Sequence, residues 1–352
     1  SNPEQSQGSE KSSKSRKSLP TDRRPYIAAT LHNIAIVHML NLRFKRALPY
    51  LTKAVTIRRE YLDEGDPDQV VSLVKYGICN FALGNFGESQ AAFKMALLST
   101  SPAGNMNEVS NEDTIADLAQ MGEVLNNLAC LSLHAGQATL ALQTLKQALE
   151  VFFAALSDSL YLSSQRTSSS SILMAISVIR GNVGYIDLKL NESDAAVVAF
   201  QASLMHQQMV LKDTDETLMI TMDHLAMAHF QRKSFDRATQ ILHRLYHAQV
   251  QNLSPTHLEV AQILCKLAVA NAEAKNYEEA LECVRWVHHC RSKNNDPALS
   301  NRFLSLAKVG WLTQETVCKI VKKAKKAAIL KAKLDMPLTT KQTSGSGEQS
   351  MF

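Results

Sequence analysis

Six small residues recur along the chain at intervals close to 42 residues. Each lies in a stretch whose apolar residues return every three or four positions, which is the period of a helix. They are spaced 42, 52, 55, 42 and 42 residues apart, and they are Ala35, Gly77, Ala129, Gly184, Ala226 and Ala268. Such a period is typical of chains built from stacked helical units. The two longer intervals indicate insertions near residues 99–113 and 157–171, which we expect to form surface loops because they are rich in Ser, Asn, Gly and Pro.

Each small residue is followed by a turn residue, in four repeats by an aromatic residue, and then by alternating small and apolar residues. This order predicts two helices joined by a short turn, and Gly136 is therefore expected in a turn rather than inside a helix. A single pair cannot cover its own apolar faces, so neighbouring pairs must stack. We expect the pairs to begin near residues 27, 70, 122, 176, 218 and 260. The aromatic residues expected between paired helices are Phe44, Phe86, Phe235 and Tyr277.

The sequence therefore predicts an all-α fold, a right-handed superhelical solenoid of about six helix pairs with a C-terminal capping helix. Aromatic residues make up 6% of the chain, and alternating runs typical of strands are absent. We expect a disordered basic, serine-rich tail over residues 1–24, the six-repeat array over 25–295, Lys-rich capping helices over 296–334 and a disordered tail over 335–352.

These patterns resemble the tetratricopeptide repeat, in which small and aromatic residues stand at the same offsets. The longer period, the "NNLA" of residues 126–129 and the linkers over 60–70 and 251–261 are similar to the repeats of kinesin light chains. No heptad pattern precedes the repeats, so the resemblance extends to the repeats and not to the motor subunit itself. It implies a scaffold that binds a peptide of another protein in a concave groove.

A row of polar residues stands two positions before the six small residues. It consists of Asn33, Lys75, Asn127, Asn182, His224 and Lys266, and Asn126 adjoins it. Asparagine is unfavourable inside a helix, so the row must serve a purpose. One interpretation is that these side chains tie one repeat to the next. The other is that they line a groove, where the amides hydrogen-bond a bound peptide and the two lysines attract acidic side chains. In kinesin light chain repeats asparagines line the groove, and the resemblance implies the same role for the asparagines of this row.

The positive charge of the chain is concentrated at its ends. The net charge is +5, and residues 302–334 contain nine Lys and Arg against one acidic residue. In that segment Val317, Ile320 and Val321 form part of an apolar stripe with the lysines largely off it, as in a helix that closes a solenoid. The alternative is a basic amphipathic helix that binds a membrane surface or nucleic acid. The mildly acidic body is not suited to gripping a phosphate backbone, so we expect no nucleic-acid or membrane partner.

No catalytic or metal-binding motif stands out in the sequence. His243 and His247 have metal-ligand spacing but no third ligand, and the residues of "CVRWVHHC" (283–290) are too irregularly spaced to meet on one helix. We therefore expect that the protein is not an enzyme and that it binds no cofactor and no small-molecule substrate. The rival hypothesis is a solenoid that carries an added enzyme site. The six cysteines form no CxxC pair, which favours reduced thiols and a location in the cytoplasm, or alternatively the nucleus.

Overall fold

The computed structural model describes residues 22–63, 65–100, 111–161 and 166–293, together with residues 319–320, 322–323 and 325–326. Within these parts the chain forms twelve α-helices and no β-strand. The predicted all-α fold class is therefore confirmed. Residues 1–21 and 335–352 of the predicted tails, and most of the segment over 296–334, lie outside the described residues, while Arg24 at the end of the predicted N-terminal tail begins α1.

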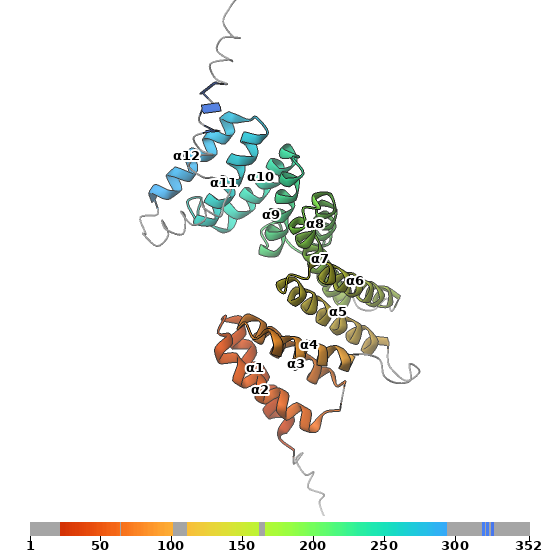
Figure 1. Ribbon diagram of the computed structural model, residues 1–352. Helices are drawn as coiled ribbons and strands as arrows, with labels where there is room; N and C mark the ends of the chain where they lie inside the picture. The colour runs from red at the N-terminus through yellow and green to blue at the C-terminus, as the bar shows by residue number, and fades with distance from the viewer. Residues whose placement is uncertain are drawn as a thin grey trace, which may run out of the picture. The chain divides into compact units, whose positions relative to one another are not determined.

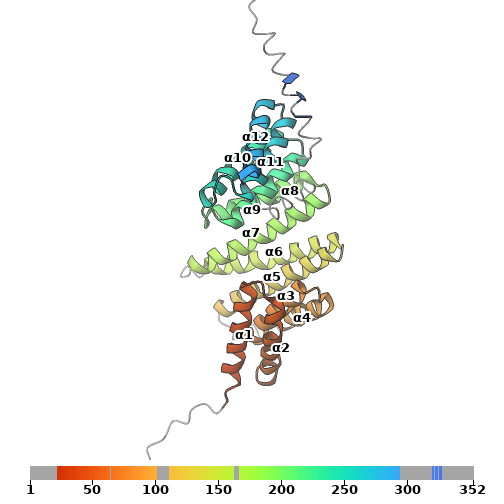
Figure 2. The ribbon, with the colours of Figure 1, turned by 90° about the vertical axis from the view of Figure 1, so that its left-hand side faces the viewer.

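The chain divides into two compact units, Ser1–Ser163 and Ser164–Phe352. The first contains three helix pairs, which are α1 (Arg24–Leu40) with α2 (Phe44–Tyr61), α3 (Pro67–Ala82) with α4 (Phe86–Thr100), and α5 (Asn111–His134) with α6 (Ala138–Tyr161). The second helix of each pair packs on the first helix of the next, and the first helices α1, α3 and α5 also touch in succession. Figures 1 and 2 show these helices in red to yellow.

The second unit repeats this arrangement. Its pairs are α7 (Arg166–Lys189) with α8 (Ser193–Gln208), α9 (Glu216–Gln231) with α10 (Phe235–Asn252), and α11 (Leu258–Glu273) with α12 (Tyr277–Lys293). Here α8 packs on α9 and α10 packs on α11, so that each unit is a stack of three pairs (Figure 1).

The turn inside every pair contains one residue with positive φ, seven positions after the small residue of the repeat. These residues, whose φ angles lie between 55° and 82°, are Leu42, Gly84, Gly136, Asn191, Lys233 and Lys275. The prediction that Gly136 lies in a turn is confirmed. The left-handed conformation costs nothing for glycine but about 1 kcal/mol or more for an ordinary residue. Three of the six turns therefore contain a strained Leu or Lys.

Three of the junctions between pairs are marked by capping residues. Asp66 accepts a hydrogen bond from the backbone N–H of Asp68 at the start of α3, and Asp215 accepts one from Thr217 at the start of α9. Nδ1 of His257 accepts one from the N–H of Glu259 at the start of α11. Each cap stands eleven positions before the small residue of its repeat, so helix starts as well as turns keep the register of the sequence.

The described residues of the two insertions are helical, which corrects the expectation of surface loops for those residues. Helices α5, α6 and α7 have 24 residues each, whereas the other helices have 15 to 18. Residues 111–113 belong to α5, residues 157–161 to α6 and residues 166–171 to α7, while 101–110 and 162–165 lie outside the described residues. Serine is only a weak breaker of helices, and packing along a neighbouring helix readily overrides its propensity. Pairs α5–α6 and α7–α8 accordingly begin about ten residues earlier than predicted, and the other four begin within three.

The small residue of each repeat is buried against the residue sixteen positions later, on the second helix. The pairs are Ala35 with Leu51, Gly77 with Phe93, Ala129 with Leu145, Gly184 with Phe200, Ala226 with Leu242, and Ala268 with Val284. Glycine always faces phenylalanine, and alanine always faces leucine or valine. A Cβ atom built on Gly77 would lie 2.6 Å from Cε1 of Phe93, so that glycine is required by the close approach of the ring.

The aromatic residues predicted to lie between paired helices are less buried than expected. Phe86 is 38% exposed, and Phe44, Phe235 and Tyr277 are only half-buried. They are the first residues of their helices, where the pair is open at the turn, and Phe86 there contacts the rings of Phe81 and His134. The prediction was wrong because the side chain that fills each close approach comes from two turns further along the second helix, and it is a ring only at Phe93 and Phe200.

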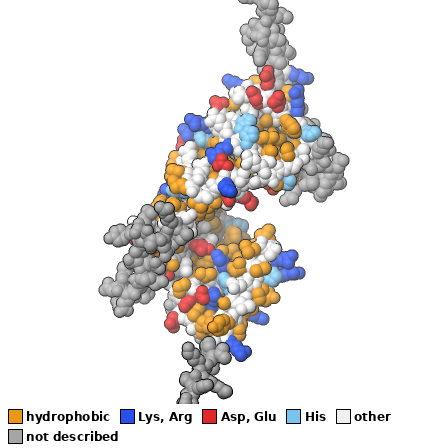
Figure 3. Space-filling model, turned by 180° about the vertical axis from the view of Figure 1, so that it is seen from behind, with side chains coloured by type: hydrophobic (Ala, Val, Ile, Leu, Met, Phe, Trp, Pro, Cys, Tyr) orange, Lys and Arg blue, Asp and Glu red, His pale blue; other side chains and the backbone are white. Residues whose placement is uncertain are grey.

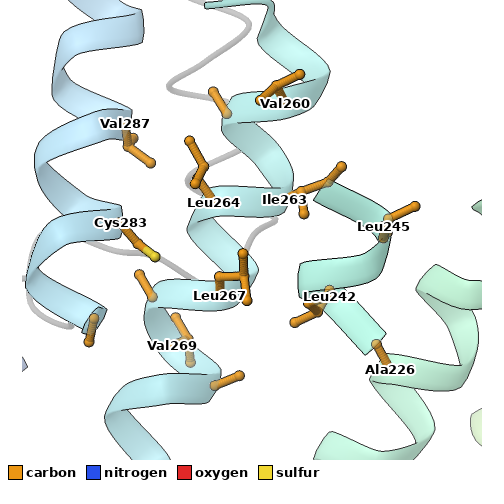
Figure 4. Close-up of a cluster of buried hydrophobic side chains, with 14 of the residues drawn as sticks. Ala226, Leu242, Leu245, Val260, Ile263, Leu264, Leu267, Val269, Cys283 and Val287 are labelled. Carbon is orange, nitrogen blue, oxygen red and sulfur yellow. The ribbon is translucent and has the colours of Figure 1, made fainter. Parts of the chain in front are cut away.

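The largest apolar cluster lies in the second unit. Figure 4 shows Leu242 of α10 directed toward Leu267 of α11, with Cys283 and Val287 of α12 on the other side of α11, and Leu245 and Val260 belong to the same cluster. Ile320 is buried in the same cluster, and the described lysines around it, Lys319, Lys322, Lys323, Lys325 and Lys326, are exposed. That placement is the one expected of a terminal helix with an apolar inner stripe.

One stretch in the described part of the chain, residues 169–189 of α7, is long and apolar enough to span a membrane by length and composition alone. Four of its apolar side chains, Ile172, Ile176, Ile179 and Ile186, are buried. The helix packs on α8 and α9 of its own unit, so its apolar residues serve the core of that unit.

Candidate functional site

The polar row predicted from the sequence lies on the first helix of every pair. In the first unit Asn33 belongs to α1, Lys75 to α3, and Asn126 with Asn127 to α5. In the second unit Asn182 belongs to α7, His224 to α9 and Lys266 to α11. Two residues correspond to about 200° around a helix, so each member of the row is nearly opposite the small residue that contacts the second helix. The first helices therefore carry the row on the side turned away from their partners.

In the first unit the row combines an exposed amide with an ion pair. Asn33 is exposed. Nζ of Lys75 lies 3.1 Å from Oε1 of Glu123, which belongs to α5, so this lysine connects two consecutive first helices. Both side chains are substantially exposed, so the pair is expected to contribute no more than about 1 kcal/mol.

Asn127 has a buried donor that is not satisfied. Its side chain is half-buried, and Nδ2 lacks both solvent exposure and a hydrogen-bond partner. A buried donor left unpaired costs about 1–3 kcal/mol. Its neighbour Asn126 is also half-buried. An alanine at position 127 would avoid this cost and favour the helix, so stability of the fold does not account for the asparagine.

In the second unit Lys266 is held by a carboxylate of the adjacent repeat. Its Nζ lies 2.6 Å from Oδ2 of Asp223, which precedes His224 in α9. The two side chains are 21% and 27% exposed, which makes this pair better shielded from solvent than that of Lys75. The pair joins α11 to α9 across the face that carries the row.

His224 is packed between aromatic rings rather than presented to solvent. Its ring stacks on Phe200 of α8 at 5.6 Å and meets the edge of Tyr185 of α7 at a similar distance. Burial lowers the pKa of His224, the positive charge of Lys266 lowers it further, and Asp223 partly offsets both. The imidazole is therefore neutral near pH 7. Asn182 is half-buried on α7.

Both sequence interpretations of the row find support in different residues. The two lysines join consecutive first helices through Glu123 and Asp223, as expected of side chains that tie repeats together. Exposed Asn33 and the unsatisfied amide of Asn127 are what a surface that binds a peptide would present. The two carboxylates are partners that the sequence did not indicate.

A buried polar network in the first unit was also missed. Arg58 of α2 donates to Oγ of Ser72 in α3 at 2.5 Å and to the backbone carbonyl of Asp68. Oγ of Ser72 lies 3.0 Å from Nδ1 of His32 in α1. Burial lowers the pKa of His32, and Arg58 lowers it further, so Nδ1 of the neutral ring can accept a hydrogen bond from the Ser72 hydroxyl. This network joins α1, α2 and α3. The Ser72 hydroxyl at its centre is fully buried, so solvent does not reach it.

The histidines and cysteines singled out in the sequence form no shared site. Among the described residues no cluster of three or more His, Cys, Asp or Glu is placed to hold a metal ion. His243 and His247 are exposed on α10. Cys283 and Cys290 are buried in the core of the second unit, and burial raises the pKa of the Cys283 thiol to about 11. A protonated thiol is a poor nucleophile and a poor metal ligand.

Comparison with known protein families identifies the repeat type of the N-terminal helices. A model of the tetratricopeptide repeat family matches residues 26–97, which include α1 to α3 and most of α4. No curated protein has a significantly matching sequence.

Several solved structures are similar to the chain. BtubC (BKLC) from P. vanneervenii is 16% identical with a TM-score of 0.54, and the match covers 72% of this chain and 94% of that one. A putative kinesin light chain with nearly identical TPR-like repeats, from Podosopora anserina, is 13% identical with a TM-score of 0.36 and coverage of 78% and 99%. PilF of Pseudomonas aeruginosa is 14% identical with a TM-score of 0.49 and coverage of 81% and 99%.

The backbone similarity to BtubC supports the repeat fold. The register of the matched segment, with its small residue, turn residue and large residue at fixed offsets, continues through all six helix pairs. Residues 26–97 therefore carry tetratricopeptide repeats, and the described chain as a whole has the fold of stacked helix pairs.

Proposed function

We propose that this protein is a non-catalytic scaffold that binds a peptide segment of another protein along the polar row of its first helices. Stacked helix pairs present such rows on an extended surface, and surfaces of this kind are used for protein recognition. Amides in the row would hydrogen-bond the main chain of the peptide, which requires no particular peptide sequence.

The observation that carries this proposal is the unsatisfied amide of Asn127. Its side chain stands at the row position of α5, and its amide nitrogen has no hydrogen-bond partner within the described chain. A carbonyl oxygen of a bound peptide would remove the cost of the unpaired donor. Because the side chain as a whole is half-buried, a change of rotamer suffices to bring the amide to the surface.

The two lysines have a narrower role than the sequence implied. Lys75 and Lys266 each already face a carboxylate, so an acidic peptide side chain would have to compete with Glu123 or Asp223. We propose that the lysines orient the row and that the asparagines supply most of the binding energy.

The cysteines support a reducing location, the cytoplasm or alternatively the nucleus. Among the described residues, Cys79, Cys130, Cys265 and Cys283 have free thiols. Burial raises the pKa of Cys265 to about 12, so its thiol stays protonated at physiological pH. Free, inert core thiols are typical of proteins from reducing compartments.

The test is site-specific crosslinking. A photoreactive amino acid is placed at Asn33 in α1 or Asn182 in α7 and, as matched controls, at the exposed glutamines Gln90 in α4 and Gln240 in α10. After irradiation in a native extract, crosslinked peptides are sequenced by mass spectrometry. We expect segments of a partner protein to be crosslinked at each row position and not at the glutamines. Equal crosslinking from the second-helix controls would contradict the proposal.

A further inference from the structure

The first helix of the chain has a stacking face that nothing covers among the described residues. Four residues of α1 recur at helical spacing along one side, Ile27, Leu31, Ile34 and His38. We call them the open face. Ile27 is 48% exposed and Ile34 is 37% exposed, while Leu31 and His38 are half-buried. Figure 2 shows α1 at the outer edge of the first unit, beside α2.

The same register positions are covered in later first helices. The equivalents are Gln69, Leu73, Tyr76 and Asn80 in α3; Leu218, Met222, Leu225 and His229 in α9; and Val260, Leu264, Leu267 and Asn271 in α11. All of these are buried except Tyr76, which is half-buried, and the α5 equivalents are likewise buried or half-buried. The open face matches α9 most closely, since both read as three large apolar residues followed by histidine.

A helix covers each of these faces. In α9, Leu225 packs in one cluster with Val197 and Phe200 of α8. In α11, Leu264 and Leu267 pack with Leu242 and Leu245 of α10 (Figure 4). The second helix of the preceding pair therefore occupies this position in the array. The open face of α1 has the same pattern but no preceding pair among the described residues.

The surroundings of the open face are strongly basic. Residues 22–61, which contain α1 and α2, carry eight Lys and Arg against two Asp and Glu, a net charge of +6. Seven of the eight cations are exposed. Residues 62–301, by contrast, carry sixteen Lys and Arg against twenty-six Asp and Glu, a net charge of −10. Figure 3 shows charged side chains scattered among exposed apolar ones on the surface turned to the viewer.

Two of these cations stand beside the open face itself. The ring of His38 stacks on Tyr50 of α2 at 5.7 Å. Arg46 and Lys53 share the face of α2 that carries Tyr50, because they stand four residues before and three after it. Both are exposed, and within the described residues neither makes an ion pair. An apolar stripe flanked by unneutralised cations is complementary to an amphipathic helix with acidic flanks.

We propose that the open face of α1 docks an amphipathic helix of another protein that carries acidic residues beside its apolar stripe. A second copy of this chain is disfavoured, since a symmetric contact would bring two basic helix pairs together. The N-terminal residues 1–21 are unsuited to the role, because they contain a single large apolar residue, Leu19, and are themselves basic. This surface is separate from the polar row, and its test does not depend on the row.

The probe is a synthetic helix based on α8, the helix that covers the matching face of α9. It comprises residues 193–208, with a hydrocarbon staple between positions 198 and 202 to hold the helix, which would be marginal at this length. The exposed positions Gln201, Met205 and Gln208 become Glu in the acidic probe and Lys in the basic probe. Binding to the full chain is measured by fluorescence anisotropy at low and high salt.

We expect the acidic probe to bind at least about tenfold more tightly than the basic one at low salt, with the difference shrinking as salt screens the charges. The double substitution Ile27→Glu with Ile34→Glu should weaken binding of the acidic probe by about tenfold or more. The matched control Leu98→Glu, at a 78% exposed position of α4, should leave it unchanged. Circular dichroism checks that both variants keep their helices.

Three results would overturn the proposal. The first is equal affinity for the two probes on the unmodified chain, which needs no variant. The second is a dimer, seen by analytical ultracentrifugation and dissociated by the α1 substitutions, which would identify a second copy as the occupant. The third is binding to phosphatidylserine vesicles that the same substitutions abolish while the acidic probe fails to bind, which would identify a membrane surface.

Discussion

Exchanging Gly77 for alanine places a methyl group against the ring of Phe93. The new Cβ would lie 2.6 Å from Cε1 and 2.8 Å from Cδ1 of that ring, where carbon atoms normally approach to about 3.5–4.0 Å. Overpacking of this kind costs about 1–3 kcal/mol. Alanine returns up to about 1 kcal/mol through its helix propensity. We therefore expect Gly77→Ala to lower the free energy of unfolding by about 1–2 kcal/mol.

Two other glycines serve as matched controls. A Cβ on Gly184 would lie 3.0 Å from Cε1 and Cζ of Phe200, so the ring need move only slightly, and the two effects should cancel to within about 0.5 kcal/mol. A Cβ on Gly87 would meet nothing within 4 Å, so Gly87→Ala should stabilise α4 by about 0.5–1 kcal/mol. The expected order of stability is Gly87→Ala, Gly184→Ala, then Gly77→Ala.

A second substitution tests whether the ring is the cause. Phe93→Leu alone should cost about 1 kcal/mol or more through the cavity it leaves. Combined with Gly77→Ala it recreates the alanine–leucine pair of Ala35 and Leu51, so the double variant should be more stable than the sum of the single effects by about 1 kcal/mol or more. The measurements are urea denaturation by circular dichroism and hydrogen exchange in α3 and α4, since repeats open locally. Strict additivity, or equal effects of Gly77→Ala and Gly87→Ala, would refute the reasoning.

Three further predictions concern turns, pH and thiols. Lys233→Gly and Lys275→Gly each relieve a positive φ and should raise the free energy of unfolding by about 1 kcal/mol, and an unchanged melting temperature would contradict this. Burial lowers the pKa of His32, His206, His224 and His229 below the ordinary 6.5. The unfolded chain therefore binds protons first, and the urea midpoint should fall as pH drops below about 6.5. A midpoint that rises on acidification would show the opposite linkage. Burial raises the pKa of Cys265 to about 12 and of Cys283 to about 11, so iodoacetamide should modify both far more slowly than a free cysteine, as followed by mass spectrometry.

The register of the fold was predictable because it rests on local chemistry. A small residue, a turn seven positions later and a large residue sixteen positions later are fixed by helix geometry, and each can be read from the chain. Gly136 and its equivalents followed directly from this pattern. Helix length in the insertions was not predictable, because the serine-rich residues 166–171 are helical although serine has only a modest helix propensity.

The aromatic contacts show a second limit of reasoning from pattern. Phe86 and Phe93 both follow Gly77 at regular offsets, and only the packing shows that Phe93 fills the close approach while Phe86 stands at the open end. The sequence did contain a signal of this contact: repeats with glycine at the small position have phenylalanine sixteen positions later, whereas repeats with alanine have leucine or valine there. Finding it requires comparing two positions across all repeats rather than following one.

The position of the polar row was likewise readable from sequence, but its partners were not. Glu123 stands six positions before Ala129, and Asp223 stands three before Ala226, so the two carboxylates share no register that a repeat search would find. They meet Lys75 and Lys266 only through the stacking of successive helices. Contacts between repeats depend on three-dimensional packing, and for the same reason the His32, Ser72 and Arg58 network was not anticipated.

The most direct test of the proposed function measures the affinity of the crosslinked partner segment, as a synthetic peptide, for variants of the row. Asn127→Ala combined with Asn182→Ala is compared by isothermal titration calorimetry with the control pair Gln143→Ala and Gln240→Ala, which changes exposed amides on second helices. At about 1–3 kcal/mol for each hydrogen bond lost, the row variant should bind at least tenfold more weakly, with a melting temperature no lower than that of the parent, and the control should bind normally. Unchanged affinity of the row variant with a lowered melting temperature would show that the asparagines serve the stacking of the repeats and that the peptide binds elsewhere.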